Sequence, residues 1–75
     1  MSAADIQKKL ELKRWLSRVE RLLVQRFVAD GVHGDAAKYV AGQVVNKSRS
    51  TLCGFKRAGV SPEEAAQAVY AQRLL

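Results

Sequence analysis

The chain has 75 residues, and its 13 Lys and Arg side chains outnumber its seven Asp and Glu, which gives a formal net charge of +6. This length limits the chain to one domain, residues 1–75, with a modest core. Cys53 is the single cysteine, so a disulfide within the chain is excluded. There is no signal-peptide pattern and no apolar run near the ~18 residues of a membrane span, and we therefore expect a cytoplasmic protein.

The first predicted element is a helix over residues 3–30 that carries a long apolar stripe. Its start fits a capping box, Ser2 to Asp5, and Gly31 is a natural terminator. Seven apolar residues recur at spacings of three and four: Leu12, Trp15, Leu16, Val19, Leu22, Leu23 and Phe27. At about 100° per residue they share one side of a helix, which predicts a core or oligomer interface.

This helix is long for so small a chain. At 1.5 Å per residue it would extend roughly 42 Å, whereas a compact globule of this length has a radius of gyration of about 11 Å. Either its first turns fray, or the protein is an elongated hairpin, or a second copy covers the protruding stripe. We expect the last two together, an elongated molecule that forms a homodimer.

The face opposite the stripe carries a ridge of arginines. Arg14, Arg18 and Arg21 follow one another at spacings of four and three. Such a ridge fits either a solvated helix face or a surface that meets an anion, since the repulsion within it costs only about 0.2–0.5 kcal/mol per pair.

A second helix is predicted over residues 36–58, with Asp35 as its N-cap. The connection from Gly31 is short, so this helix should run back antiparallel to the first. It is either continuous or broken near residues 46–50, where Asn, Ser and Thr side chains compete with the helical backbone.

Gly59 ends the second helix, and Ser61-Pro62 begins a third over residues 62–73. No strict alternation of apolar and polar residues points to a strand. The predicted fold is therefore all-α: an antiparallel hairpin of two long helices plus a short third C-terminal helix.

The basic residues are unevenly distributed. Between Asp35 and Glu63 there are five basic residues and no acid. Lys, Arg and Ser are residue types that donate to phosphate oxygens. The candidate nucleic-acid-binding residues are Lys38, Lys47, Arg49, Ser50, Lys56, Arg57, Arg14, Arg18 and Arg21.

No catalytic or metal-binding constellation is visible in the sequence. His33 is the one histidine, and it stands in a predicted loop without a second ligand or a nucleophile beside it. We therefore expect no enzymatic activity, no cofactor and no metal.

The charge distribution predicts a small DNA-binding regulatory or accessory protein that contacts phosphates mainly through the second helix. DNA is favoured over RNA as its partner. A helix-turn-helix made of residues 49–58 and 62–73 is disfavoured, because Glu63 and Glu64 would stand at the end that contacts bases and phosphates.

The alternative is a non-enzymatic protein–protein interaction module: an adaptor, inhibitor or assembly factor. Its first-helix stripe would pack on a partner helix, and its basic surface would attract an acidic protein. An anionic membrane surface is a third and weaker possibility.

Overall fold

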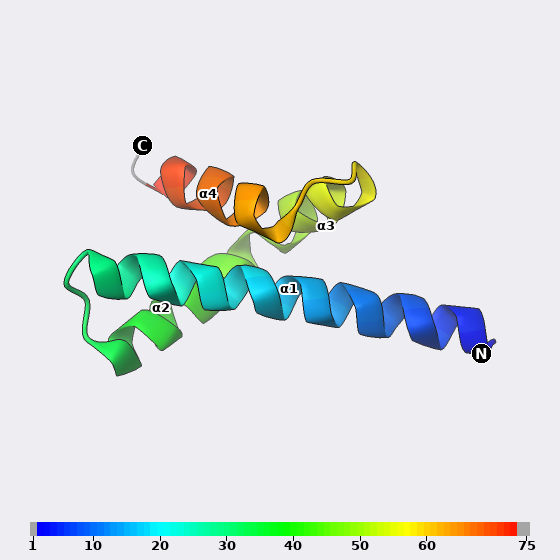
Figure 1. The fold of residues 1–75 in the computed structure, drawn as a ribbon, viewed down its shortest axis with the longest axis horizontal. Coiled ribbons are helices and arrows are strands. Elements are labelled where there is room, and N and C mark those ends of the chain that lie inside the picture. The colour runs from blue at the N-terminus through cyan, green and yellow to red at the C-terminus, as the bar shows by residue number, and fades with distance from the viewer. Residues whose placement is uncertain (1, 74–75) are drawn as a thin grey trace.

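A computed structural model describes residues 2–73, which form four helices (Figure 1). They are α1 (Ala3–Ala29), α2 (Gly34–Lys47), α3 (Arg49–Arg57) and α4 (Pro62–Arg73). No strand occurs in residues 2–73, and the all-α prediction is confirmed. Of the predicted domain, Met1, Leu74 and Leu75 lie outside the described residues.

Short-range capping bonds fix where α1 and α4 begin. The Asp5 amide donates to Ser2 Oγ over 3.3 Å, as the capping pattern predicts. At the start of α4 the Glu64 amide donates to Ser61 Oγ over 3.2 Å. Both helices therefore start where the local sequence places them.

Two glycines end α1 and α3 with the same backbone motif. Gly31 has a φ of 94° and Gly59 a φ of 81°, in the left-handed region that glycine adopts without steric cost. The amide of the following residue, Val32 or Val60, then donates to a carbonyl five residues back over 2.9 Å. Helix ends set by glycine are again local features of the sequence.

The predicted cap of α2 is wrong. His33 occupies the N-cap, and its Nδ1 accepts a hydrogen bond from the Asp35 amide over 3.4 Å. Asp35 lies inside the first turn instead, where its negative charge faces the positive end of the helix. The helix starts earlier than expected because Gly34 takes up the helical conformation.

The second predicted helix is interrupted at Ser48, so the broken alternative is the one found. Ser48 has φ −99° and ψ 13°, outside the helical range, and separates α2 from α3. Its backbone still bridges the two helices, because its amide bonds the Val44 carbonyl and its carbonyl accepts from the Leu52 amide. The break redirects the chain with little loss of backbone hydrogen bonding.

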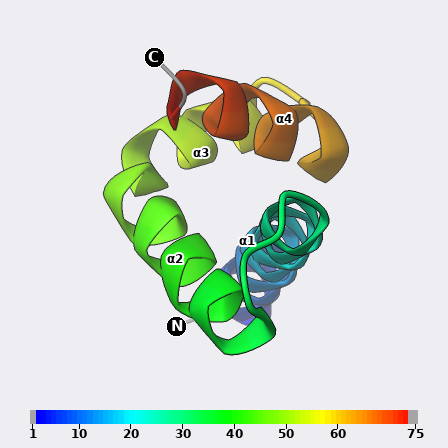
Figure 2. The same cartoon turned by 90° about the vertical axis from the view of Figure 1, so that its left-hand side faces the viewer.

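Three helices are arranged around α1. Seen along α1, α2, α3 and α4 form an arc with α1 at its opening (Figure 2). α2 passes behind α1, and α4 runs back above it (Figure 1). Because the arc covers α1 on one side only, the opposite side of α1 stays exposed along its length.

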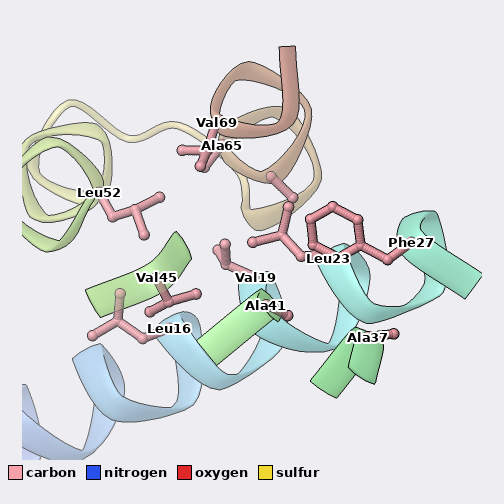
Figure 3. Close-up of a cluster of buried hydrophobic side chains, with 11 residues drawn as sticks. Leu16, Val19, Leu23, Phe27, Ala37, Ala41, Val45, Leu52, Ala65 and Val69 are labelled. Carbon is pink, nitrogen blue, oxygen red and sulfur yellow. The ribbon is translucent and has the colours of Figure 1, made fainter. Parts of the chain in front are cut away.

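The core lies inside this arc (Figure 3). α1 contributes its large side chains, and α2 contributes mostly small ones, so the two helices approach closely. The buried residues are Leu16, Val19, Leu23, Phe27, Ala37, Ala41, Val45, Leu52, Ala65, Ala66 and Val69. The remaining stripe residues, Leu12, Trp15 and Leu22, are half-buried against this cluster.

Two aromatic side chains connect α1 to the C-terminal part of the chain. The indole N–H of Trp15 donates to the Val60 carbonyl, 3.3 Å away, in the loop before α4. The rings of Phe27 and Tyr70 lie 5.5 Å apart at 52°, and the Arg26 guanidinium sits 5.4 Å above the Tyr70 ring. Both contacts fix α4 against α1.

The N-terminal third of α1 projects beyond the other helices. Residues 2–11 are exposed, and the molecule measures 44 × 23 × 18 Å with a radius of gyration of 13.0 Å. That radius exceeds the ~11 Å of a compact chain of this length, so the elongated shape is confirmed. The stripe itself does not protrude, because it begins at Leu12; Ile6 and Leu10 are the large apolar residues exposed on the projection.

None of the four helices combines the length and the apolar character that crossing a membrane requires.

Replacing Leu23 by Ala should destabilise the fold by about 2–5 kcal/mol, since Leu23 is fully buried and its removal leaves a cavity. Urea unfolding followed by circular dichroism measures the change. Val28→Ala is the matched control on the same helix, because Val28 is 48% exposed and its truncation should cost less than about 1 kcal/mol. Equal losses in the two variants would contradict this core.

Replacing Gly54 by Ala should stabilise the protein by about 0.5–1 kcal/mol. Gly54 lies inside α3, and a Cβ added there meets no atom within 4 Å, so alanine gains helix propensity without a clash. Gly59→Ala is the control of opposite sign, because its φ of 81° is strained for alanine. Thermal unfolding of both variants checks the pair; a destabilised Gly54→Ala would show that α3 packs more tightly than described.

Candidate nucleic-acid interface

The exposed side of α1 carries a basic hollow. Lys13, Arg14, Arg18 and Arg21 line it together with Leu10 and Ser17, and it encloses about 400 Å³. Because all of these residues belong to α1, the helix alone brings four cationic side chains to one surface. The three arginines are the ridge predicted from the sequence.

A second and larger hollow, of about 600 Å³, lies between α1 and the junction of α2 with α3. Its basic residues are Lys9 and Lys13 from α1 and Arg49 from α3, with Glu20 as the acid. Arg49 follows Ser48 directly, so the helix break is what places this side chain beside α1.

A third hollow, of about 380 Å³, joins α1 to the first half of α2. Arg21 and Lys38 line it with Glu20, Ser17 and Val24. Gly42 lies on the same flank of α2, where a Cβ would come within 3.1 Å of Glu20 Oε1. A Cβ at position 42 would therefore require the end of the Glu20 side chain to shift by a few tenths of an ångström.

The three hollows are contiguous because they share residues. Ser17 lines all three, and Lys13 and Arg21 each line two. We call their seven basic residues, all of them exposed, the basic face: Lys9, Lys13, Arg14, Arg18, Arg21, Lys38 and Arg49. From Lys9 to Arg21 it extends along α1 for about 18 Å at 1.5 Å per residue.

Few acids offset this charge. Glu20, half-buried, is the acid among the residues that line the three hollows. Arg18 also pairs with Glu63 of α4 at 3.4 Å, with both side chains more than half exposed. An exposed pair of this kind contributes at most about 1 kcal/mol and exchanges easily with other partners.

The predicted binding residues divide into two groups. Arg14, Arg18, Arg21, Lys38 and Arg49 belong to the basic face. Lys47 instead lines a hollow on the α4 side of α2, with Val44, Ser48, Val69 and Gln72. On α3, Ser50 and Arg57 are exposed and Lys56 is half-buried, and none of these three lines a hollow described above.

Sequence reasoning missed Lys9 and Lys13. The signal was present, because Lys9, Lys13, Ser17 and Arg21 follow at intervals of four and form one row along α1. Lys9 and Lys13 lie beside the apolar stripe, where the row begins, and the prediction considered the face opposite the stripe, which the row reaches at Arg21.

The basic face carries no aromatic residue among those lining its three hollows. Tyr39 is the exposed aromatic side chain of the described chain, 70% exposed on α2, and its hydroxyl accepts from Gln43 Nε2 over 2.8 Å. Trp15 and Phe27 pack in the interior. A platform on which unpaired bases stack is therefore not formed at this surface.

Other chemistry has little support in the described part of the chain. No group of three or more His, Cys, Asp or Glu that could hold a metal ion occurs in residues 2–73. His33 serves as a helix cap, and Cys53 is half-buried on α3. The expectation that the protein is not an enzyme stays a prediction.

Comparison of the chain with family models, with curated proteins and with solved structures finds no match.

Proposed function

We propose that this protein binds double-stranded DNA by placing its basic face against the phosphate backbone. The observation that carries the proposal is the gathering of seven exposed basic residues from three helices on one contiguous surface. Neutralising several phosphates at once releases condensed counterions, which is the main driving force of sequence-independent DNA binding. α1 supplies five of these seven residues, so in this proposal α1 contributes more than α2 and α3.

Two features favour duplex DNA over other nucleic acids. The hollows lack the aromatic side chains on which single strands stack. Residues 3–8 of α1 also project beyond the other helices, and a lone helix fits the ~12 Å major groove of B-DNA. The major groove of RNA duplexes is too narrow for side chains to read. We therefore propose a role as a regulatory or accessory DNA-binding protein.

Reversing three charges of the basic face should abolish binding. The variant carrying Lys13→Glu, Arg14→Glu and Arg21→Glu should bind a labelled duplex about a hundredfold more weakly or worse, because three phosphate contacts are lost and three repulsions are added. Fluorescence anisotropy measures the affinity, and circular dichroism confirms that the variant folds.

The matched control reverses Lys8, Lys47 and Arg57, which gives the same change in net charge at positions outside the hollows of the basic face. It should lose less than about tenfold in affinity, through the long-range field alone. This control also tests the assignment of phosphate contacts to Lys47 and Arg57. If both triple variants lose affinity equally, binding follows net charge and the basic face is not the interface.

Binding should weaken steeply with salt. If four to seven phosphates are contacted, the affinity should fall by about 10² to 10⁴ between 50 and 200 mM salt, with a log–log slope of about −0.9 per contact. The slope for Arg14→Ala should be smaller by about one. A flat salt dependence would exclude a phosphate-based interface.

The homodimer expected from the sequence is the remaining part of this proposal. Ile6 and Leu10 leave about half of their surface exposed on the projecting end of α1, at 50% and 48%, and pairing two such ends would cover them. Light scattering at micromolar concentration, with and without duplex, tests the dimer. The mass of one chain under both conditions would contradict it.

A further inference from the structure

The larger hollow of the basic face has a feature that DNA binding does not use. Its base is apolar and consists of Leu12 and Leu16 from α1 and Val45 from α2. Leu16 and Val45 are each 8% exposed, so they form a floor, while the half-buried Leu12 stands at its edge. Phosphates gain nothing from an apolar floor, because they lose hydration there without a hydrogen-bond partner.

The rim of the same hollow is basic. Lys9, Lys13 and Arg49 lie around the floor with Glu20, which gives the lining an excess of positive charge. Leu10, 48% exposed, lines the adjoining hollow on the exposed side of α1 and is not part of this floor. An apolar floor inside a cationic rim complements a ligand that is apolar on one side and anionic beside it.

We propose that this hollow binds an acidic amphipathic helix of a partner protein. Leu12 and Leu16 are one helical turn apart, so two apolar side chains at i and i+4 of a partner helix can cover both of them and Val45. Carboxylates flanking those anchors then reach Lys13 and Arg49.

Charge decides against a second copy of this chain as the occupant. A second α1 would bring its own Lys9, Lys13 and Arg14 against the same cations, and like charges at an interface cost free energy. A partner whose helix is acidic gains from the same rim. The occupant is therefore a different protein with the opposite charge.

One consequence rests on the proposed function. Lys13 and Arg49 belong both to the hollow and to the basic face, so a helix seated in the hollow excludes DNA from part of that face. The acidic partner then acts as a competitor that removes the protein from DNA. The binding of the helix itself does not depend on DNA binding.

The test uses two synthetic peptides of about 15 residues, a length at which isolated helices begin to form. The first carries Leu at i, i+4 and i+7 with Glu at the flanking positions and a fluorescein label. The second is identical except that each Leu is Ala, so it has the same charge. The Leu peptide should bind the full chain at least about tenfold more tightly, because it buries methylene groups on the floor. Equal affinities would overturn the proposal.

Protein variants locate the site. Leu12→Gln should weaken the Leu peptide about tenfold, whereas Val28→Gln, a matched change on the same helix away from the hollow, should leave the affinity within about twofold. Arg49→Glu, at an exposed position, should weaken the binding of both peptides. It provides the test if circular dichroism shows that Leu12→Gln does not fold. Unchanged Leu-peptide binding in folded Leu12→Gln, or in Arg49→Glu, would place the peptide elsewhere and refute the site.

The duplex assay separates this proposal from the proposed function. Leu12→Gln removes no charge, so its affinity for duplex should stay within about twofold of the parent chain. If the parent chain binds the Leu peptide and not duplex, the proposed function fails and the helix site stands. If it binds duplex and the two peptides bind equally, the reverse holds.

Discussion

The burial of one apolar stripe on α1 is the interaction on which the rest of the structure depends. α2, α3 and α4 share few large apolar side chains of their own, and each of them covers part of the stripe between Leu12 and Phe27. These three helices, arranged in an arc, bury the stripe from one side of α1 (Figure 2). The opposite side of α1, which includes the half-exposed Leu10 and Val28, stays in solvent (Figure 2).

The extent of the stripe also sets the shape of the molecule. Leu12 is the first stripe residue, and the helix nevertheless begins at Ala3, because the Ser2 cap and the following residues favour helix without tertiary support. The projection therefore forms because the residues before Leu12 have helix propensity of their own, although they lie outside the core. Ile6 and Leu10 are its large apolar side chains, and they are the residues that the proposed dimer would cover.

The local features of the sequence predicted the helices well, and the features that depend on tertiary packing were less accessible. Ser2, Gly31 and Ser61 act on neighbouring residues, so their effects could be read directly. His33 is an unusual cap, and the capping propensity of Asp35 placed the predicted N-cap two residues too late. The alternatives at residues 46–50 could not be resolved, because Ser disfavours a helix only weakly and the direction in which α3 packs is not a local feature of the sequence.

The same distinction applies to the candidate interface. The arginine ridge lies on a single helix and was predicted from spacing alone. Arg49 lines one hollow with Lys9 and Lys13 because of the bend at Ser48 and the packing of α2 on α1. The periodicity of the sequence predicts neither of these. The sequence showed that the second half of the chain is basic, and the packing decides which of those cations lie beside α1.

The apolar stripe of α1 and the basic face are connected through the stability of the fold. A small core leaves little free energy to oppose repulsion, and seven cations on one face repel one another in the folded chain more than in the extended one. A polyanion or an acidic helix that binds this face relieves that repulsion only in the folded state, and it therefore stabilises the fold by mass action. If the basic face binds an anionic partner as proposed, the charge that opposes folding of the chain alone is also the charge that couples folding to binding.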